Sequence, residues 1–455
     1  MDEFSRATTN EEIINSFQKI NNILEKNLLE FTDIDKSELL RIAKEKKLLE
    51  NINWNLIKSK FGDLLKFVIY KKKEMIMWKK YNINKNKKGY LYDILLDNFV
   101  IKNNFTNSKF YVKKASVNTE SIILLTDKNE VFVKGLNTFN KFGSESYKNL
   151  EMFTKLKNIP ENCRDVVNGY SFAFYIFEKE ILACGCGESG RTGTNNLKIN
   201  NFDKVLIEEK VIQVCCSSVS SAFLTENGDI YSCGSCIYNG HNKEDNILIP
   251  KKIIFDSKFK FIKISSGEGG YHFGVLNENG DVYVWGHNRV GQLGINPKEI
   301  KEVKRKFKVL DDDKNDDHEI VLTVPYKLNL KRRVFDINFS WGHSCLIFSN
   351  NDISLFGRNC CNQLGLNKDH CIIDKKSHEY YYKQNILNTH MKIDQLVLKK
   401  YGTLMLSENI IYYFGALNDN SLKIFNYKND FECKKLKEFT DYNEISIIDN
   451  RYVII

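Results

Sequence analysis

The sequence predicts an all-β fold: a seven-bladed β-propeller, closed by pairing of strands from its two ends and preceded by a small α-helical N-terminal region. Three observations predict it. A short glycine-rich unit occurs six times, at intervals of 50, 49, 52, 71 and 58 residues. An apolar segment of strand length precedes each copy. The two ends of the repeat region resemble complementary halves of one further unit.

The chain is predicted to divide into a helical region, residues 1–87, and the propeller, residues 88–455. In the first region Ile13, Phe17 and Leu24 lie at helical spacing, proline is absent and there is a single glycine. Glycine and alternating apolar residues become frequent only after this region. We therefore expect a small helical domain or cap before the strands begin.

The repeat unit is clearest in GDVYVWGHNRVGQLG, residues 280–294. An aliphatic residue stands four positions before its central glycine, called here the key glycine, and only Gly or Asn stands five positions after it. These two residue types tolerate the left-handed backbone region best, so we expect a fixed turn there. The glycines assigned a structural role in the repeats are Gly135, Gly185, Gly190, Gly234, Gly286, Gly291, Gly294, Gly357, Gly365 and Gly415.

Each repeat is predicted to be an antiparallel sheet of about four strands. Asn-Gly-Asp or Asn-Asn-Asp, which is typical of tight hairpin turns, precedes three of the units, at Asn227, Asn279 and Asn350. A matching apolar segment lies upstream of each hairpin, for example at residues 261–276 and 334–348. Small sheets that repeat about every fifty residues predict propeller blades.

One copy of the unit imitates a nucleotide-binding motif. Gly185, Gly187 and Gly190 spell G-x-G-x-x-G after a predicted strand. A dinucleotide site also needs a helix directly after the glycines, but residues 191–204 have no helical apolar pattern. The glycines are therefore assigned to the repeat, and no cofactor is predicted.

The two ends of the repeat region are predicted to pair. Residues 87–98 resemble the second half of a repeat, with Leu91 at the place of Val282, and residues 443–455 resemble a first half. Together they would make a seventh blade and remove the exposed sheet edges that invite aggregation.

Two insertions interrupt the repeats, near residues 295–333 and 366–392. The first contains the acidic run DDDKNDD, which lacks the spacing of a calcium-binding loop, so we expect a disordered loop without a metal. The second contains three successive tyrosines, and clustered tyrosines are typical of interfaces. The candidate partner contacts are Tyr380, Tyr381 and Tyr382.

Catalytic and metal-binding chemistry is not indicated. Cys233 and Cys236 form C-x-x-C, but no second pair stands in register, so buried free thiols are predicted rather than a zinc site. His272 and His343 occupy matching repeat positions without a Ser or Asp partner at an informative spacing, which favours a structural role. No catalytic, cofactor-binding or metal-ligating residue is assigned, and no enzymatic activity is expected.

The segments VYVWGHNRVGQLG, SSGEGGYHFGVL and SWGHSCLIF together resemble the regulator of chromosome condensation repeat family, which forms seven-bladed propellers. The resemblance covers about residues 90–455 and is most specific in the blade that ends at Gly294. A kelch-type propeller has a similar period but expects paired glycines in most blades, and this chain has one such pair, Gly269–Gly270. Residues 37–81, which end in MIMWKKY, in part resemble an F-box but lack its Leu-Pro opening.

The resemblance implies two functions of different class. The first is a non-catalytic protein-interaction platform, with the F-box-like helices docking onto a cullin-ligase adaptor and the propeller recognising substrates of a ubiquitin ligase. The alternative is a guanine-nucleotide exchange factor for a Ran-like small GTPase. The basic chromatin-binding tail of the founding exchange factor is missing, because residues 1–35 hold 3 basic and 8 acidic residues.

Nucleic acid and membranes are not expected as direct partners. The net charge of +9 arises largely from residues 36–88, with 16 basic and 5 acidic residues, and such a run is typical of a solvated helix face. No run of 18 apolar residues exists, and the opening MDEFSRATTN does not resemble a signal peptide. With twelve scattered cysteines, the chain is expected in the cytoplasm or the nucleus.

Overall fold

The computed structural model divides the chain into two compact units, residues 1–87 and 88–455. The predicted helical region and its F-box-like segment lie outside the described residues, as does the acidic run of the first insertion. The structure describes residues 91–93, 98–99, 112–118, 120–143, 149–242, 245–267, 269–295, 309–310, 321–348, 352–365, 371–373, 380–387, 393–408, 410–415, 434–438, 446–447 and 452–454.

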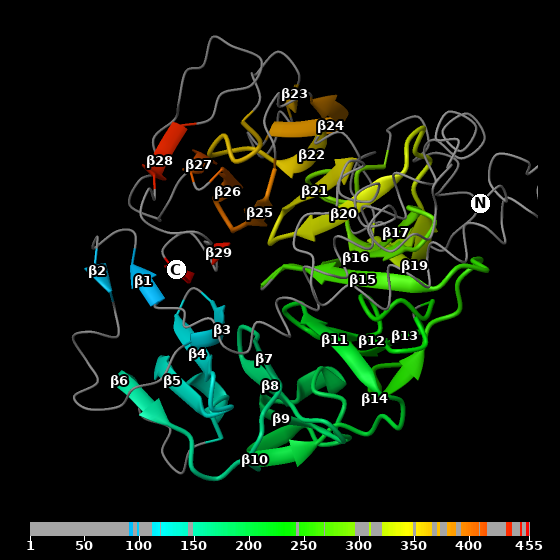
Figure 1. Cartoon of the computed structure of the whole chain (residues 1–455). Coiled ribbons are helices and arrows are strands. Elements are labelled where there is room, and N and C mark those ends of the chain that lie inside the picture. The colour runs from blue at the N-terminus through cyan, green and yellow to red at the C-terminus, as the bar shows by residue number, and fades with distance from the viewer. Residues whose placement is uncertain are drawn as a thin grey trace, which may run out of the picture. The chain divides into compact units, whose positions relative to one another are not determined.

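Within the second unit, six antiparallel sheets are each built from consecutive strands (Figure 1). The first blade contains β3 (Val112–Val117), β4 (Ser121–Thr126), β5 (Val131–Gly135) and β6 (Leu150–Lys155). The second contains β7 (Asp165–Asn168), β8 (Phe172–Ile176), β9 (Ile181–Cys186) and β10 (Lys198–Lys204). The third contains β11 (Val211–Cys216), β12 (Ser220–Thr225), β13 (Ile230–Gly234) and β14 (Ile247–Lys252).

The next two blades each have a fifth strand, which the insertions supply. The fourth contains β15 (Phe261–Ser266), β16 (His272–Asn277), β17 (Val282–His287), β18 (Val309–Leu310) and β19 (Val321–Lys327). The fifth contains β20 (Val334–Phe339), β21 (His343–Phe348), β22 (Ile353–Arg358), β23 (Cys371–Ile373) and β24 (Tyr380–Leu387). The sixth contains β25 (Gln395–Leu398), β26 (Gly402–Ser407), β27 (Ile410–Gly415) and β28 (Lys434–Glu438).

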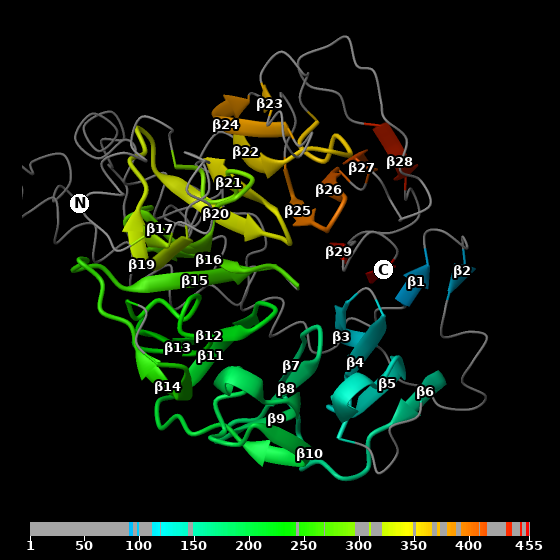
Figure 2. The same cartoon turned by 180° about the vertical axis from the view of Figure 1, so that it is seen from behind.

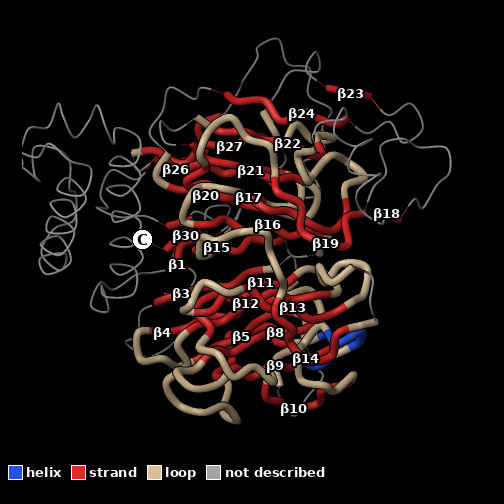
Figure 3. The backbone as a smooth tube through the Cα atoms, turned by 90° about the vertical axis from the view of Figure 1, so that its right-hand side faces the viewer, coloured by secondary structure: helices blue, strands red, loops and turns tan. Residues whose placement is uncertain are grey.

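The blades are arranged radially. The first strand of each blade contacts the first strand of the next, from β3 and β7 through β15 and β20 to β25. Seen from either side, these first strands lie nearest the centre (Figure 1, Figure 2). An edge-on view shows turns and loops gathered at the strand ends (Figure 3). The prediction of an all-β propeller is confirmed for the described residues, where the helices are two short 3-10 turns, η1 (Thr138–Asn140) and η2 (Glu188–Gly190).

The prediction of seven full blades is corrected by this structure, which has six. The predicted pairing of the two ends is present, because Leu91 pairs with Ile454 and Tyr92 with Val453. The resulting sheet, however, has strands of only two or three residues: β1 (Leu91–Asp93), β2 (Asn98–Phe99), β29 (Ser446–Ile447) and β30 (Tyr452–Ile454). Strands of two or three residues are shorter than the usual length of about five or six residues, so this sheet is not a blade comparable with the other six.

The core lies between neighbouring blades. The second strands carry it: all six residues of β4, β12, β16, β21 and β26 and all five of β8 are buried. In the largest cluster Trp285 stacks on Phe273 at 5.1 Å between ring centroids and donates its indole N–H to the Tyr238 carbonyl oxygen. Burial of both faces of a sheet explains why these strands are continuously apolar instead of alternating.

Polar joints connect successive blades at their inner strands. Lys114 of β3 pairs with Asp165 of β7, and Lys263 of β15 pairs with Asp336 of β20, at equivalent repeat positions. These side chains are only partly exposed, so their ion pairs are less screened than those on the outer surface. These ion pairs therefore help to fix the position of one blade relative to the next.

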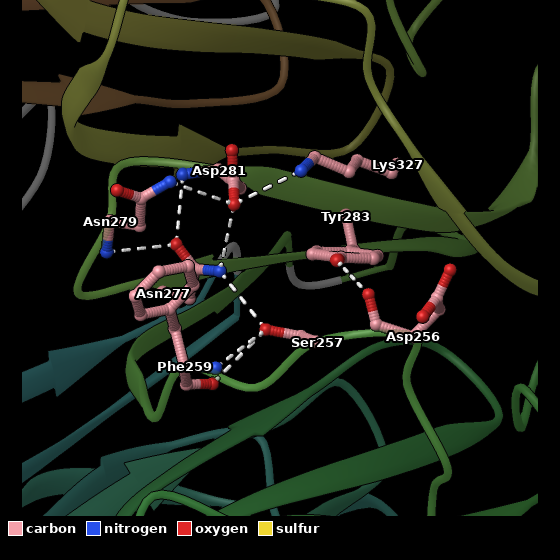
Figure 4. A network of polar contacts seen from close by, with 8 residues as sticks. All are labelled: Asp256, Ser257, Phe259, Asn277, Asn279, Asp281, Tyr283 and Lys327. Atoms are coloured by element: carbon pink, nitrogen blue, oxygen red, sulfur yellow. Dashed lines mark hydrogen bonds and ion pairs between the residues drawn. The ribbon is translucent and has the colours of Figure 1, made fainter.

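The hairpins between the second and third strands lie at one end of the blades, and a polar network surrounds the hairpin of the fourth blade (Figure 4). The buried Asn277 side chain accepts hydrogen bonds from the backbone N–H groups of Asn279 and Asp281, and it donates to Ser257 Oγ at 3.2 Å. Burial opposes ionisation of Asp281, but hydrogen bonds from Asn277 and Asn279 and the ammonium of Lys327 outweigh it and lower the pKa. This network ties the hairpin to the preceding inter-blade connection.

The key glycines end the third strands in a conformation that other residues rarely adopt. Their φ values lie between 89° and 118°, and at Gly286, where φ is 100°, an added Cβ would lie 2.2 Å from the Tyr271 carbonyl oxygen. The left-handed conformation predicted five positions later is found at Asn140, Gly190, Gly291 and Asn362. The prediction is wrong for Asn239, because the neighbouring Gly240 takes the positive φ of 85° instead, and Asn420 lies outside the described residues.

We expect Gly286→Ala to lower the free energy of unfolding by about 3 kcal/mol or more, because it adds backbone strain and a clash with a strand that cannot move. Gly342→Ala is the matched control: its Cβ would lie 3.5 Å from the Arg358 Cβ, an ordinary contact, and should change stability by less than about 1 kcal/mol. Urea denaturation measures both. Equal losses in the two variants would contradict this role of the key glycine.

Candidate functional site

The end of the blades opposite the hairpins is called here the turn face. It is formed by the turns between first and second strands and by the glycine-rich loops that follow third strands. The two sets meet because each key glycine packs against a first turn: Gly185 approaches the Ser171 carbonyl, and Gly357 approaches the Gly342 carbonyl. Loops on a rigid β-scaffold are the usual place for binding residues, so this face is the expected place for a site.

An asparagine two positions after the key glycine shapes the loop in three blades. The Oδ1 atoms of Asn137, Asn288 and Asn359 accept hydrogen bonds from the backbone N–H five residues later, at 3.0, 2.8 and 2.8 Å. All three asparagines are buried. Their side chains replace backbone partners inside the loop, so the loop holds one conformation without regular secondary structure.

Trp341 forms the centre of the most distinctive cluster on the turn face. Arg358 lies over its ring with the guanidinium carbon 4.6 Å from the ring centroid, and Lys400 Nζ lies 5.3 Å from the same centroid. Lys400 Nζ also lies 4.8 Å from the ring of Tyr401. We call Trp341, Arg358, Lys400 and Tyr401 the cationic-aromatic cluster; all four are partly exposed.

Aromatic residues continue from this cluster onto the neighbouring blades. A Cβ on Gly269 would lie 3.3 Å from the Trp341 ring, which places the turn of the fourth blade directly beside it. From the same turn Tyr271, 37% exposed, packs against Tyr238 of the third blade at 5.1 Å between centroids. The turn face thus presents an arc of aromatic side chains across four blades, with two cations at one end.

The first two blades add further apolar groups to this face. Phe139 is 59% exposed and adopts a φ of 57°, which is rare for a bulky residue, and Tyr170 is 45% exposed. Leu197, 56% exposed, lies in the loop that follows η2. Tyr and Trp side chains with adjacent cations are typical of the centres of protein interfaces.

The candidate contacts Tyr380, Tyr381 and Tyr382 are found in a strand rather than in the expected loop. They begin β24, where Tyr381 and Tyr382 pair with Arg358 and Gly357 of β22 on one side and with β23 on the other. The sequence analysis missed Trp341 and its neighbours. A signal was available, since an aromatic residue occurs in the first turn of four blades: Tyr170, Tyr271, Trp341 and Tyr401.

His272 and His343 make equivalent hydrogen bonds between blades. His272 Nε2 lies 2.9 Å from Ser344 Oγ, and His343 Nε2 lies 3.2 Å from Thr403 Oγ1. Each hydroxyl donates its own proton to a carbonyl oxygen of the preceding blade, so each histidine must donate from Nε2. The matching positions seen in the sequence therefore correspond to matching structural roles.

Burial lowers the pKa of His272 and of His343 to about 3, since both rings are fully enclosed. Each Nδ1 atom is buried without a hydrogen-bond partner among the described residues. A neutral imidazole with its one N–H engaged in a structural bond has no reacting group beside it. Neither ring has the arrangement of a general base.

Ten cysteines whose side chains the structure describes are free thiols, and seven of them are buried. Cys233, from the C-x-x-C pair, is completely buried, and its sulfur contacts the Arg191 carbonyl oxygen at 3.7 Å. Across the described part of the chain, no three His, Cys, Asp or Glu side chains gather as metal ligands would.

No helix among the described residues has the length and apolar character that crossing a membrane would require.

The repeat unit matches a known protein family. Two models of the regulator of chromosome condensation (RCC1) repeat match this chain, one over residues 261–292 and one over residues 279–347. The matched segments include Gly286, Gly291 and Gly294. The resemblance to this repeat family is confirmed for these blades.

Curated relatives match over part of their length. The human E3 ubiquitin-protein ligase HERC2 is 27% identical over 28% of this chain and 3% of its own length. The mouse RCC1-like G exchanging factor-like protein is 25% identical over 39% of this chain and 40% of its own. The chain thus spans 40% or less of these relatives, so a shared repeat is shown and a shared activity is not.

Two solved structures share the fold. The structure of yeast RCC1 (Prp20) with Kap60 matches with a TM-score of 0.59 and 16% identity, covering 81% of this chain and 88% of that one. Human WBSCR16 matches with a TM-score of 0.56 and 14% identity, covering 77% and 87%. At such identities the likeness supports the propeller fold alone.

The buried histidines predict a specific dependence of stability on pH. Because their folded pKa lies below the ordinary value of 6.5, their contribution is complete above pH 6.5 and is lost as pH falls toward 3. At pH 5 the free energy of unfolding should be lower than at pH 7 by about 2 kcal/mol for each ring that must stay neutral in the folded protein. The double variant His272→Gln/His343→Gln keeps a side-chain donor at each position but cannot titrate. Its free energy of unfolding, measured by denaturation, should therefore fall less between pH 7 and pH 5 than that of the wild type. An unchanged loss would contradict the assignment.

Proposed function

We propose that this chain is a non-catalytic protein-interaction platform whose turn face binds an acidic surface of a partner protein. The observation that carries the proposal is the cationic-aromatic cluster, in which Arg358 and Lys400 both lie over the ring of Trp341. The two cations share a partly exposed site with aromatic rings. A partner carboxylate would gain charge attraction, and the rings would bury apolar area.

The rigidity of the blades supports this reading. The loops that carry Arg358 and Gln363 are held by buried asparagine side chains and by bonds to the next blade, so little side-chain and backbone entropy is lost on binding. Tyr238 and Tyr271 pack together, and the turn that carries Tyr271 lies beside the Trp341 ring, so aromatic groups adjoin the cations. An interface of this composition gains affinity from a few aromatic anchors.

We further propose that the platform recognises substrates of a ubiquitin ligase, with residues 1–87 docking onto a cullin-ligase adaptor. Support comes from the resemblance of residues 37–81 to an F-box and from the matched repeats in the relative named as the ligase HERC2. In this arrangement the propeller selects the protein to be modified while the chemistry belongs to other subunits. Residence in the cytoplasm or the nucleus would fit such a role.

A second candidate is guanine-nucleotide exchange on a small GTPase. It is favoured by the relative named as an RCC1-like G exchanging factor-like protein, which shares 39% of this chain. Exchange would also use a propeller face without a catalytic residue on this chain, because a partner that binds the nucleotide-free GTPase promotes nucleotide release by mass action. The two candidates differ in which partner is retained and in whether residues 1–87 are needed.

We also propose that the terminal sheet, although too small to count as a blade, joins the sixth blade to the first and closes the ring. Strand β29 contacts β25 and β26 of the sixth blade, and Lys399 Nζ donates to the Val117 carbonyl oxygen of the first blade at 3.4 Å. The first and sixth blades therefore approach each other at the turn face. The short pairing of β1 with β30 would then fasten the two ends of the ring.

Partner binding should depend on the cluster. We expect Lys400→Glu, and separately Trp341→Ala, to weaken partner binding about 10- to 100-fold, as loss of an anchor residue does. Lys260→Glu on the hairpin end makes the same charge change at an exposed lysine and should leave binding unchanged. Quantitative affinity purification of the full chain and of residues 88–455 from native cells, with thermal melts as the folding control, measures the effect.

The same purification separates the two functions. Retention of a cullin adaptor by the full chain and its loss from residues 88–455 would support the ligase reading. Retention of a small GTPase by both, strongest without nucleotide, would support exchange. If Lys400→Glu and Trp341→Ala retain every partner as wild type does, the turn face is not the binding surface.

The ring closure predicts that removal of residues 443–455 destabilises the whole propeller. Strand β1 would lose β30, and the sixth blade would lose its contact with β29. We expect a fall in melting temperature of several degrees, as for a loss of 1–2 kcal/mol, together with increased aggregation from the exposed edges. A melting curve identical to that of the full chain would contradict the closure.

A further inference from the structure

The glycine-rich loop of the fifth blade contains two adjacent cysteines with different surroundings. Cys360 is partly exposed, whereas Cys361 is 7% exposed. Their sulfur atoms lie 3.5 Å apart, within hydrogen-bonding distance for sulfur. The loop belongs to the turn face and directly follows Arg358.

Two side chains direct N–H groups toward this pair. Arg358 donates from Nε to Cys360 Sγ at 3.1 Å while its guanidinium lies over Trp341, so the cation is held in place from both sides. Gln363 is fully buried, and its Oε1 accepts the Cys361 backbone N–H at 2.9 Å. That bond fixes the amide, and its Nε2 group is buried without a hydrogen-bond partner among the described residues.

These groups lower the pKa of Cys360 to about 6. The hydrogen bond from the Cys361 thiol contributes most; burial opposes it, and the charge and N–H of Arg358 and the amide of Gln363 add to it. The surroundings of Cys360 therefore favour its thiolate, with the Cys361 thiol as hydrogen-bond donor. Other cysteines behave in the opposite way, since burial raises the pKa of Cys163 and Cys184 to about 12.

We propose that Cys360 is a nucleophilic thiolate and a modification site for peroxides, with Arg358, Cys361 and Gln363 as the residues that stabilise its charge. The Cys360 sulfur attacks one oxygen of hydrogen peroxide and the O–O bond breaks. The sulfur loses two electrons and becomes sulfenic acid, and the second oxygen leaves as hydroxide, which takes up a proton to form water. The Gln363 amide N–H, which is directed toward Cys360, is available to the negative charge that develops on sulfur or oxygen.

The sulfenic acid is expected to condense with a small thiol such as glutathione rather than with Cys361. Adjacent Cα atoms across a trans peptide lie about 3.8 Å apart, whereas disulfides need about 4.4–6.8 Å. In the condensation the small thiol's sulfur attacks the Cys360 sulfur, a disulfide forms, and water leaves. Cys361 therefore acts as the hydrogen-bonding neighbour and not as the resolving thiol.

Modification would alter the cationic-aromatic cluster. Arg358 is bound to the Cys360 sulfur on one side and lies over Trp341 on the other, so a group added to Cys360 displaces the guanidinium. This consequence for partner binding rests on the proposed function of the turn face. The reactivity of the thiolate does not depend on any partner.

The first test measures alkylation of the folded full-length chain with iodoacetamide between pH 5 and pH 9, followed by peptide mass spectrometry. Cys236 is the matched control, since it is a partly exposed thiol in the equivalent loop of the third blade. We expect Cys360 to react at least about 10-fold faster than Cys236 at pH 7, because nearly all of it is thiolate. Arg358→Met should shift the pH midpoint of the Cys360 rate upward by a unit or more. Equal rates at the two cysteines, or an unchanged midpoint, would overturn the proposal.

The second test treats the chain with hydrogen peroxide and traps sulfenic acid with dimedone. A dimedone adduct at Cys360 that disappears in Cys360→Ser is the expected result, and Cys361→Ser should still form it at a reduced rate. No adduct at Cys360 under conditions that keep the chain folded would contradict the proposal. If the adduct forms but partner binding is unchanged, the proposed binding role of the turn face fails while the modification site stands.

Discussion

The structure depends on one recurring bond between blades: a side-chain hydroxyl at the start of a second strand donates to a carbonyl oxygen in the glycine-rich loop of the preceding blade. Ser221 reaches the Arg191 carbonyl at 2.6 Å, Ser344 reaches Gln292 at 2.8 Å, and Thr403 reaches Gln363 at 2.7 Å. Each donor is buried, so leaving it unpaired would cost about 1–3 kcal/mol. The bond can form only if the loop presents its carbonyl at the right place, and this requirement governs the rest of the repeat.

The key glycine and the loop asparagine meet that requirement. A positive φ at Gly286 or Gly357 turns the chain out of the third strand over the first turn of the same blade, where a Cβ would collide with backbone. Asn288 or Asn359 then closes the loop from inside. The buried histidines extend the same joint by donating to the hydroxyl oxygens, which explains why His272 and His343 occur at matching positions. Features that could resemble catalytic machinery are thus explained by blade packing.

The proposed binding and modification sites occupy positions that are not needed for the hydrogen bonds between blades. Trp341, Lys400 and Tyr401 lie in first turns, which need only close the hairpin. Arg358 ends β22, and Cys360 lies in the loop that follows, whose conformation is already fixed by Asn359. Their identities can therefore vary without loss of the fold. The same loop holds two cysteines of opposite character, because one sulfur is enclosed and the other faces an arginine. Rigid loops with variable side chains suit both recognition and selective reactivity.

The sequence by itself determined the strands, the repeat and most of the turn geometry, because these depend on residues close together in the chain. A glycine at a fixed distance from an apolar strand predicts a positive φ at Gly185 or Gly291 without knowledge of any neighbour. The pairing of Leu91 with Ile454 was also predictable, since both halves keep the repeat pattern.

Contacts between blades decided the rest. The terminal strands are too short for a seventh full blade. Tyr380–Tyr382 belong to β24, which pairs with the edge of β22. At the turn of the third blade Gly240, and not Asn239, has the positive φ. Trp341, Arg358 and Lys400 lie far apart in the chain, so only the tertiary structure brings both cations within 6 Å of the Trp341 ring.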